Sequence, residues 1–369
     1  MISGDIQAIK GKQGPFSTTL KGLSRHWGEV IVYCTSLNEN LIFRPYPNVT
    51  LLSFKRSLFS KIFLAQKIGQ LCKEHNPNLI LSHDYGFVLN GFNSLFVSKL
   101  SGIPYISEIF HIEGYPHISS SIDYAYRLIM RLYVLLSKNH VSFYRVMNKQ
   151  DVYQRLMSWG VLEEKIKNIS AIYLDQKIFY DRKAKRINDL VFCGRLVSNK
   201  GIFNILEALF AMKQKGKDYK LTMVGNGPLE SEVNKFVKDH NLTNNVKHIP
   251  WVETPNDLAE IYSQSKILIC ASTAEGGPRV PIEAMACGAA IITTPVGVMP
   301  ETIQHKKNGM IYHWEQEQLE SMIESLLENK EKRSKMAAEG LITAKSFDVD
   351  ATLKKYALSS QEAALSLTK

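Results

Sequence analysis

The sequence predicts an α/β protein made of two doubly wound, Rossmann-like domains that face a cleft. Its 369 residues exceed one ordinary domain and suit two. Short β-rich runs alternate with segments of helical periodicity, which is the pattern of parallel βαβ units. Apolar runs such as 267–270 lack the alternation of a half-exposed strand, so we expect sheets covered on both faces. Ligands of such sheets bind outside the carboxyl ends of the strands.

The first half of the chain opens with Met1-Ile2-Ser3, so its first strand is either very short or begins late. Apolar residues then recur at helical spacing from Phe16 to Trp27, after Gly14 and Pro15, which predicts a first helix there. Runs rich in β-branched and aromatic residues predict strands at 29–34, 49–54, 79–82, 105–110 and 144–147.

The second half of the chain is more regular. Short β-rich runs predict strands at 190–193, 221–224, 246–249, 266–271 and 290–293. Helical spacing predicts helices at 202–213, 229–240, 258–263 and 281–287, with a helical tail from Glu315. Pro281 opens one of these helices, because proline is favoured at the first helical position.

Charge changes between the two halves. Residues 1–170 hold 19 Lys and Arg against 11 Asp and Glu, whereas residues 171–369 hold 26 against 24. The polar run 181–186 lies close to this change. We therefore expect one domain over residues 1–172 and a second over 173–345, with a C-terminal helix over 346–369 that rejoins the first.

Composition excludes several classes of protein. The hydrophobic fraction of 45% and charged fraction of 22% are those of a globular protein, not of a disordered or collagen-like chain. No run approaches the roughly 20 apolar residues of a membrane-spanning helix, and residues 1–5 do not begin a signal peptide. The five cysteines are odd in number and lack paired spacing, so we expect reduced thiols in a cytoplasmic protein.

The stretch from Glu275 to Gly288 carries the strongest chemical signal. It follows an apolar strand, contains Gly276 and Gly277, and runs into a helix. Backbone N–H groups and the helix dipole at such a turn favour an anion. Glu275 and Glu283 flank the turn, although Glu283 alone reads equally well as an ordinary helix-stabilising carboxylate in the first turn.

Other turns occupy equivalent positions at the carboxyl ends of predicted strands. One holds Arg195 and Lys200, two cations that can neutralise a diphosphate without a metal. Another holds Gly225 and Asn226, and a third covers residues 294–297. Each turn alone is a weak signal, whereas their placement at one edge of one sheet indicates a shared ligand.

Together these residues resemble the retaining GT-B glycosyltransferases of group 1, family 4 (GT4), most clearly over residues 190–310. Glu275 and Glu283 match the family's E-x7-E motif, and Arg195 with Lys200 looks like its diphosphate-binding pair. The resemblance implies transfer of a sugar from a UDP- or GDP-sugar to an acceptor hydroxyl with retention. It also implies that no metal and no permanently bound cofactor is required.

The resemblance assigns roles within the donor-binding domain, residues 173–345. Glu275 would contact the transferred sugar, and Glu283 would bind the ribose hydroxyls. The amides near Gly276 and Gly277 would hold the sugar and the phosphates. Gly225 and Asn226 lie in a loop that is similar to the family's nucleotide-side loop.

The resemblance assigns the acceptor to residues 1–172. Gly14 would lie in a loop that faces the diphosphate, and His111 would lie beside the reacting sugar. A structural role is the other reading of His111. Asp348-Val349-Asp350 spells the D-x-D of metal-dependent glycosyltransferases, but its position before a helical segment favours a helix start.

Two other functions stay open. The chain can be a catalytically inactive glycosyltransferase-like module that binds a nucleotide or a partner protein. It can also catalyse another reaction on the same fold, as an epimerase or a glycan phosphorylase does. Nucleic acid is not an expected partner, because the basic stretch contains no recognition motif with interleaved aromatic residues.

Between Glu39 and Glu74 the chain has six basic residues and no acidic one. Segment 54–73 also has helical spacing, which suits either an anionic membrane leaflet or packing on the protein's own sheet. The apolar residues concerned are Leu58, Phe59, Ile62, Phe63 and Leu71, and the basic ones are Lys55, Arg56, Lys61 and Lys67. We expect a peripheral enzyme at the inner face of the membrane, whose acceptor is a lipid-linked saccharide of bacterial surface polysaccharide or lipopolysaccharide.

Overall fold

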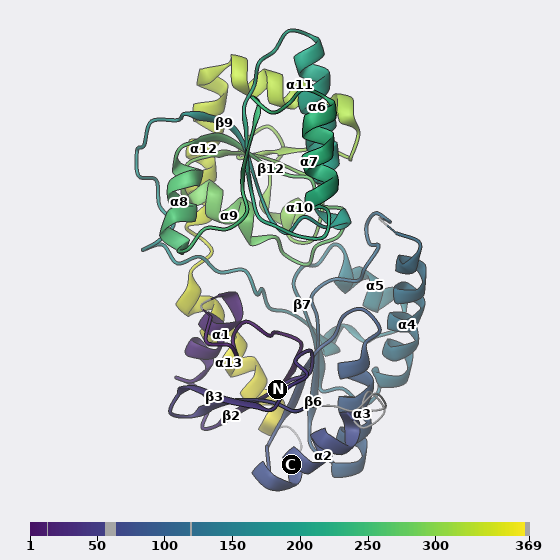
Figure 1. Cartoon of the computed structure of the whole chain (residues 1–369). Coiled ribbons are helices and arrows are strands. Elements are labelled where there is room, and N and C mark those ends of the chain that lie inside the picture. Colours follow the sequence, from purple (N-terminus) through teal and green to yellow (C-terminus); the bar gives the residue numbers. More distant parts are fainter. Residues whose placement is uncertain (13, 56–63, 119, 366–369) are drawn as a thin grey trace. The chain divides into compact units, whose positions relative to one another are not determined.

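A computed structural model describes residues 1–12, 14–55, 64–118 and 120–365 (Figure 1). The chain forms two compact units. Unit 1 contains Met1–Glu113, Tyr124–Ala171 and Asp350–Lys369, and unit 2 contains Gly114–Asp123 and Ile172–Val349. The division between Ala171 and Ile172 lies one residue from the expected boundary. The short segment Gly114–Asp123 belongs to unit 2, which the sequence does not indicate.

Unit 1 is built on an eight-stranded sheet in the order β3-β4-β2-β1-β5-β6-β7-β8. All neighbours are parallel except β3 and β4, which are antiparallel. The strands are β1 (Ile2–Ser3), β2 (Val30–Cys34), β3 (Leu41–Tyr46), β4 (Val49–Ser53), β5 (Ile80–His83), β6 (Tyr105–Ile109), β7 (Phe143–Val146) and β8 (Ile166–Asn168).

Strand β1 has two residues and nevertheless lies in the centre of the unit 1 sheet. Ile2 pairs with Tyr33 of β2 on one side and with Ser82 of β5 on the other. The sequence does not predict β3, which contains Pro45 and lies at the edge of the sheet, where a missing N–H donor is tolerated. It also does not predict β8, whose three residues are too few to show a period.

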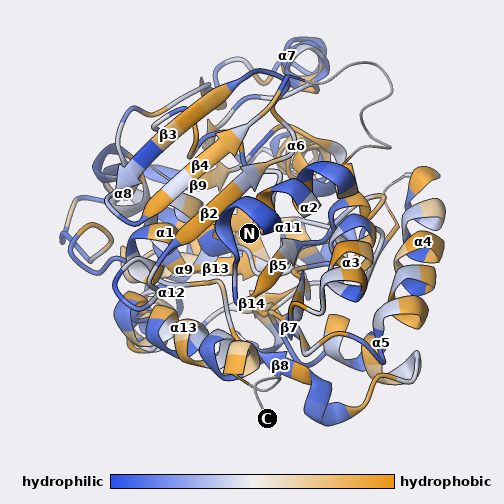
Figure 2. Cartoon of the chain, turned by 90° about the horizontal axis from the view of Figure 1, so that it is seen from below, coloured by the Kyte–Doolittle hydropathy of each residue, from blue (hydrophilic) through white to orange (hydrophobic). Residues whose placement is uncertain are grey.

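The helices of unit 1 cover its sheet. They are α1 (Pro15–Leu23), α2 (Leu64–His75), α3 (Leu89–Ser101), α4 (Ile122–Ser137, whose first two residues lie in unit 2), α5 (Val152–Ser158), the short η1 (Glu163–Lys165) and α13 (Val349–Leu365). Helix α1 begins after Gly14, as predicted. The C-terminal helix packs in unit 1, where Tyr356 contacts Trp27 with ring centroids 5.9 Å apart. Strands β2 and β4 of this unit are mostly hydrophobic (Figure 2).

Unit 2 is built on a six-stranded parallel sheet in the order β11-β10-β9-β12-β13-β14. Its first strand, β9, therefore lies beside the fourth, β12, and the order reverses between them. In doubly wound sheets this point is where ligands bind. The strands are β9 (Asn188–Cys193), β10 (Leu221–Val224), β11 (Val246–Ile249), β12 (Ser265–Cys270), β13 (Ala290–Thr293) and β14 (Met310–Ile311).

Both faces of the unit 2 sheet are covered by helices. Leu190 and Phe192 of β9 face one buried cluster, and Val191 between them faces another. This explains why the strands are continuously apolar and confirms that expectation. The helices are η2 (Ser198–Lys200), α6 (Ile202–Gln214), α7 (Glu230–Asp239), α8 (Pro255–Ser263), α9 (Arg279–Ala286), α10 (Met299–Thr302), α11 (Gln316–Glu328) and α12 (Lys330–Ala344).

The start of helix α9 differs from the prediction. The helix begins at Arg279, so Pro281 is its third residue and Glu283 its fifth, in the second turn. The prediction that Pro281 opens the helix and that Glu283 lies in the first turn is therefore wrong. The physical reason is that the first four N–H groups of a helix have no intrahelical partner, so a proline fits at its third residue as well as at its first.

Part of the segment expected to contact a membrane, 54–73, lies outside the described residues: residues 56–63, which include Arg56, Leu58, Phe59 and Lys61–Phe63. In its described part, Leu71 is buried in unit 1. Lys67 of α2 lies over the ring of Phe54, 3.8 Å from the centroid. Leu71 is therefore unavailable to a bilayer. Within the described ranges, no helix is both long enough and apolar enough to span a membrane.

Candidate functional site

The loops that follow β9 and β12 lie together at the point where the strand order of unit 2 reverses. The backbone N–H of Thr273 donates to the carbonyl oxygen of Asn199 at 2.9 Å. Gly201 has a φ of 65°, and a Cβ there would overlap the carbonyl oxygen of Ala271. Only glycine combines this left-handed conformation with so close an approach. The glycine after Lys200 thus lets the two loops pack against each other.

Lys200 and Glu275 form an ion pair across these two loops. Their side chains are 21% and 17% exposed, so each is largely withdrawn from water yet still accessible. Ser272 also donates a hydrogen bond to Glu275 Oε1 at 3.1 Å. The sequence predicted both residues as site residues, and the structure brings them into contact.

The loop that carries Glu275 is fixed from two sides. Thr294, after β13, donates its hydroxyl to the carbonyl oxygen of Ser272 at 2.6 Å. The indole N–H of Trp314 donates to the same oxygen at 3.0 Å. Gly297, in the loop after β13, has a φ of 53° and approaches the carbonyl oxygens of Glu275 and Gly276. These contacts hold the turn of Glu275, Gly276 and Gly277 in one conformation.

Glu283 lies in α9 and is only 8% exposed. Its Oε1 atom is 3.5 Å from Nε of Arg279, one helical turn earlier. Burial raises the pKa of Glu283, and the charge of Arg279 opposes that rise. The Arg279 guanidinium also lies over the ring of Tyr173, 4.6 Å from its centroid. A buried carboxylate of this kind suits hydrogen bonds to ligand hydroxyls.

Arg195 and the loop after β10 border the same edge of the sheet. Arg195 is exposed, and the described residues include no ion pair for it. Asn226 accepts a backbone hydrogen bond from Leu196 at 2.8 Å, which ties the loops after β9 and β10 together. A Cβ on Gly225 would overlap the carbonyl oxygen of Gly194. The structure therefore places Arg195, Gly225 and Asn226 beside one another, without a direct contact to Glu275.

Gly14 and His111 belong to unit 1. Gly14 precedes α1, and among the described residues beyond its chain neighbours no atom lies within 4 Å of the position its Cβ would take. Its backbone N–H donates to Ser17 Oγ at 2.8 Å. His111 follows β6 and is 3.7 Å from Glu113 through Nε2. Burial raises the pKa of nearby Asp151 to about 6, while the charges of Arg155 and then His111 oppose the rise.

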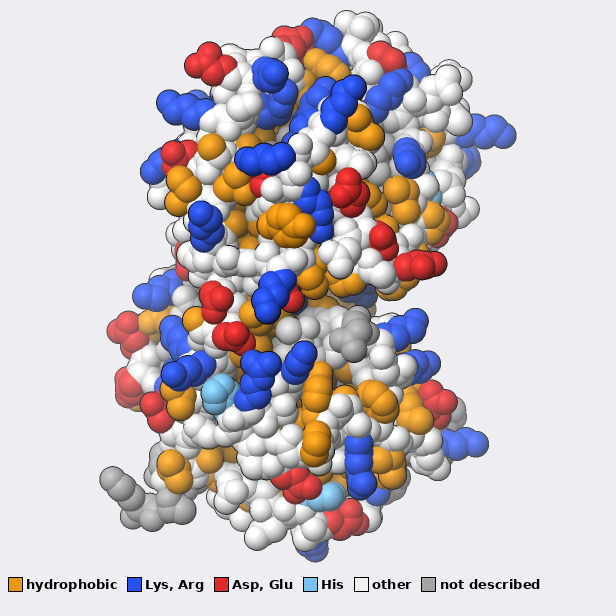
Figure 3. Space-filling view, turned by 90° about the vertical axis from the view of Figure 1, so that its left-hand side faces the viewer, with side chains coloured by type: hydrophobic (Ala, Val, Ile, Leu, Met, Phe, Trp, Pro, Cys, Tyr) orange, Lys and Arg blue, Asp and Glu red, His pale blue; other side chains and the backbone are white. Residues whose placement is uncertain are grey.

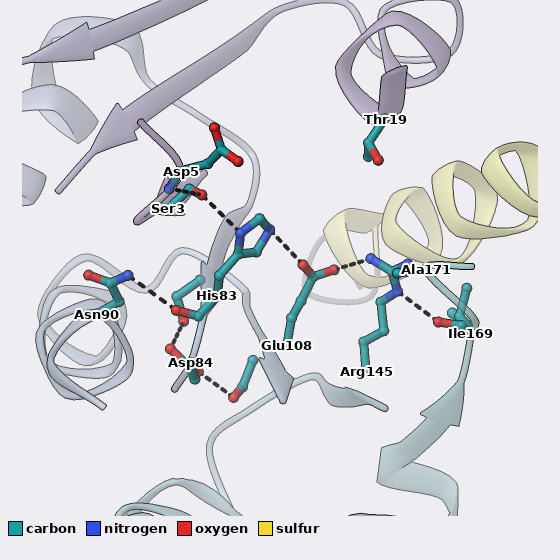
Figure 4. A network of polar contacts seen from close by, with 12 residues as sticks. Ser3, Asp5, Thr19, His83, Asp84, Asn90, Glu108, Arg145, Ile169 and Ala171 are labelled. Carbon is teal, nitrogen blue, oxygen red and sulfur yellow. Dashed lines mark hydrogen bonds and ion pairs between the residues drawn. The ribbon is translucent and has the colours of Figure 1, made fainter. Parts of the chain in front are cut away.

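Unit 1 also contains a buried chain of polar contacts at the carboxyl ends of its strands (Figure 4). Ser3 contacts His83 Nδ1 at 3.0 Å, and His83 Nε2 is 2.9 Å from Glu108. Arg145 pairs with the other oxygen of Glu108 at 2.7 Å. Burial alone would raise the pKa of Glu108, but Arg145 and His83 lower it to about 2. Because both ring nitrogens of His83 contact protein groups, we interpret this series of polar contacts as structural.

Asp84, the residue after His83, lies in a second buried polar group. Its carboxylate accepts hydroxyl hydrogen bonds from Ser107 at 2.6 Å, from Ser82 at 2.8 Å and from Tyr133 at 3.0 Å. Burial raises the pKa of Asp84 to about 7, against the effect of these bonds. Among the described residues, no cation donates a hydrogen bond to Asp84, which explains the opposite pKa directions of Asp84 and Glu108.

Sequence reasoning missed three residues of the unit 2 site. Arg279 stands within the predicted motif, and its Nε and Nη1 atoms are buried without a hydrogen-bond partner in the described structure. The ring of His117 stacks on that of Trp314, with centroids 5.0 Å apart. The position of Arg279 between the two glutamates could have indicated that it belongs to the site. His117 and Trp314 are 197 positions apart, and nothing in the sequence links them.

Comparison with known proteins finds similarity to the second half of the chain. Residues 175–341 match the family model described as "Glycosyl transferases group 1". Spore coat protein SA of Bacillus subtilis is 34% identical over 155 residues, which are 40% of this chain and 41% of that protein. The matches cover 41%, 56% and 52% of three curated relatives, so the chain spans about half the length of the curated relatives it matches.

Solved structures resemble the chain over nearly its whole length. Sucrose-phosphate synthase from Thermosynechococcus elongatus matches with a TM-score of 0.80 and 14% identity, over 98% of each chain. The Anabaena protein HepE, solved in complex with UDP-glucose, matches with a TM-score of 0.75 and 18% identity, over 98% of this chain and 99% of that one. At these identities the likeness shows the fold, which is GT-B and confirms the predicted class.

Proposed function

We propose that this chain, whose residues 175–341 match the family model described as "Glycosyl transferases group 1", transfers a sugar from a nucleoside-diphosphate sugar to an acceptor hydroxyl. The observation that carries the proposal is the ion pair of Lys200 and Glu275 at the point where the strand order of unit 2 reverses. A cation and a carboxylate there suit the two ends of such a donor, a diphosphate and a sugar with hydroxyl groups. HepE, of the same fold, is described in complex with UDP-glucose.

In the proposed reaction the bond between the anomeric carbon and the diphosphate breaks, and a bond to the acceptor oxygen forms on the same face of the sugar. Lys200 and Arg195 neutralise the charge that develops on the leaving diphosphate. The acceptor proton goes to an oxygen of that diphosphate. No carboxylate nucleophile is then needed, and Glu275 is free to orient the sugar hydroxyls.

The free protein holds Lys200 against Glu275, so the donor has to compete for both groups. The diphosphate replaces the carboxylate as the partner of Lys200, and the sugar hydroxyls replace the ammonium as partners of Glu275. Gly276 and Gly277 offer backbone amides to the same ligand. Glu283 accepts hydrogen bonds from the ribose, and the loop of Gly225 and Asn226 borders the nucleotide. The roles of Gly14 and His111 in unit 1, toward the diphosphate and the reacting sugar, stay predictions.

A screen of UDP-, GDP- and ADP-sugars by thermal shift and donor hydrolysis tests the proposal. A ligand at about one hundred times its dissociation constant stabilises a protein by about 2.7 kcal/mol, which is a measurable rise in Tm. We expect one nucleotide class, UDP or GDP, to raise Tm and to be hydrolysed slowly. A stabilising nucleotide with no turnover would favour a binding module, and no response to any donor would refute the assignment.

The substitution Glu283→Gln is expected to weaken binding of the donor nucleotide by about 10- to 100-fold. The change keeps the size of the side chain but removes charge-assisted hydrogen bonds to the ribose, each of roughly 1.5–3 kcal/mol. Isothermal titration with UDP or GDP measures the effect. Glu232→Gln, at an exposed position of α7, is the matched control. An unchanged dissociation constant would show that Glu283 does not bind the ribose.

Activity is expected to persist in EDTA. Two cations, Arg195 and Lys200, follow β9 and can neutralise the diphosphate without a metal. Asp348-Val349-Asp350 leads into α13, as predicted for a helix start. Sugar transfer is measured after dialysis against EDTA and again after addition of Mn²⁺ or Mg²⁺. A loss in EDTA that the metal restores would show a metal requirement.

We further propose a lipid-linked saccharide of bacterial surface polysaccharide or lipopolysaccharide as the acceptor, reached at the inner face of the membrane. Residues 1–170 carry 19 basic against 11 acidic side chains, a net charge of +8 that suits anionic lipid headgroups. Transfer assays with a lipid-linked and a water-soluble acceptor compare the two classes. A preference for the soluble acceptor would contradict this choice.

A further inference from the structure

Helix α4 is apolar on its buried side and also on its exposed side. Met130, Tyr133 and Val134 are buried completely in unit 1. Five further apolar side chains, spread over the length of the helix, are between 44% and 69% exposed: Tyr124, Leu128, Leu132, Leu135 and Leu136. Hydrophobic residues accordingly mark α4 along its length (Figure 2). A helix that is apolar all round is normally buried.

These five residues, which we call the α4 stripe, form one continuous surface. At about 100° per residue they fall within an arc of about 120° on the helix. Single exposed apolar residues are common on soluble proteins, but a contiguous row marks an interaction surface. The row is therefore expected to have an occupant.

The neighbouring helix α3 adds to the exposed apolar surface. Rings of the two helices are in contact, since Phe92 packs edge-on against Tyr133 with centroids 5.3 Å apart. On its own exposed side, α3 presents Phe96 and Leu100, which are 56% and 73% exposed. Two adjacent helices of unit 1 thus both present large apolar side chains to solvent.

The exposed charges on α3 and on α4 from Tyr124 onward have one sign. Lys99 on α3 and Arg131 on α4 are exposed, and Arg127 is partly exposed. The sequences of α3 and of α4 from Tyr124 onward contain no Asp or Glu. On the face drawn in Figure 3, by contrast, basic side chains are scattered with acidic ones among them. Exposed apolar residues accompanied by basic ones on the same helices are the pattern of a helix that lies on an anionic bilayer.

We propose that the α4 stripe docks on the surface of a bilayer that contains anionic phospholipids. Leu128, Leu132 and Leu135 enter the boundary between headgroups and acyl chains, and Lys99 and Arg131 contact lipid phosphates. This docking surface rests on the proposed function. It adds the part of unit 1 that would bring the enzyme to a lipid-linked acceptor. It is separate from the membrane contact expected of segment 54–73, whose Leu71 is buried and whose residues 56–63 lie outside the described residues.

Vesicle sedimentation tests this surface. The wild-type chain is expected to sediment with vesicles of phosphatidylcholine mixed with phosphatidylglycerol at low salt, and to be released at high salt. A variant with Leu128→Ser and Leu132→Ser is expected to bind about tenfold more weakly, as is one with Lys99→Gln and Arg131→Gln. The matched control carries Leu162→Ser and Ile342→Ser, at positions that are 60% and 64% exposed but outside the stripe.

Two results would overturn the proposal. One is equal sedimentation of the wild-type chain and of both stripe variants. The other is a wild-type dimer in sedimentation velocity that Leu128→Ser and Leu132→Ser disperse, without vesicle binding, because the stripe would then hold a second copy of the chain. Thermal shift with UDP and GDP on the same samples keeps the two proposals apart. If UDP or GDP still raises Tm but the chain does not bind vesicles, only the docking surface is refuted. If the chain binds vesicles but neither nucleotide raises Tm, only the donor site is refuted.

Discussion

Replacing Lys200 by alanine is expected to lower kcat for sugar transfer by about 100- to 1000-fold, the usual loss when one group aimed at developing charge is removed. Lys200 is 21% exposed and is held by Glu275. A cation withdrawn from bulk water interacts more strongly with a leaving diphosphate than an exposed one does. Arg195 is exposed, so its removal should cost less than that of Lys200.

Kinetics of Lys200→Ala, Glu275→Gln and the double variant test this assignment together. Each single change breaks the same ion pair, so a purely structural pair would give similar losses of Tm and no specific loss of kcat. We expect instead that both single variants fold with near wild-type Tm and lose kcat. Lys235→Ala, at an exposed position of α7, is the matched control. A kcat for Lys200→Ala within about threefold of the control would exclude Lys200 from the chemistry, since the expected loss is far larger.

The sequence predicted the inner strands of the unit 2 sheet well because they are buried on both faces, whereas β11 at the edge is only partly buried. The predicted strands 221–224, 246–249 and 290–293 coincide with β10, β11 and β13. A short, continuous apolar run between turn residues is typical of a buried strand, so few other structures compete with that prediction. In unit 1 the antiparallel β3 and the three-residue β8 were missed, because edge position and short length remove that signal.

The candidate site was predictable only as a set of loops. Gly201 and Gly225 follow neighbouring strands, and their close backbone approaches agree with the turns inferred from sequence. The sequence did not predict which side chains pair. Lys200, rather than Arg195, contacts Glu275, and Arg279 accompanies Glu283. Such choices depend on loop geometry that residue types do not encode locally. The placement of Gly114–Asp123 in unit 2 is likewise a tertiary result.

Glu108→Gln is expected to destabilise unit 1 by about 3–5 kcal/mol at pH 7, because it leaves Arg145 as a buried charge without its counter-ion. Glu108 is fully buried, and Arg145 is 3% exposed. The Arg145 guanidinium also lies 3.6 Å from the ring centroid of Tyr356 on α13, so the ion pair supports the packing of the C-terminal helix. Urea unfolding measures the loss. Replacing both residues at once, with Glu108→Leu and Arg145→Met, should restore part of it.

The loss should depend on pH in a direction that the pKa of Glu108 sets. Its folded pKa is about 2, below the ordinary value of 4.5, so its ionised form is stabilised by folding. That contribution, roughly 3 kcal/mol, is complete above about pH 4.5 and disappears as pH falls toward 2. Asp84 has a raised pKa of about 7 and acts in the opposite direction, but it is present in both proteins and cancels in their difference. The gap between wild type and Glu108→Gln should therefore narrow as pH falls from 5 to 3, and a gap that stays constant over this range would show that Glu108 is not ionised in the folded protein.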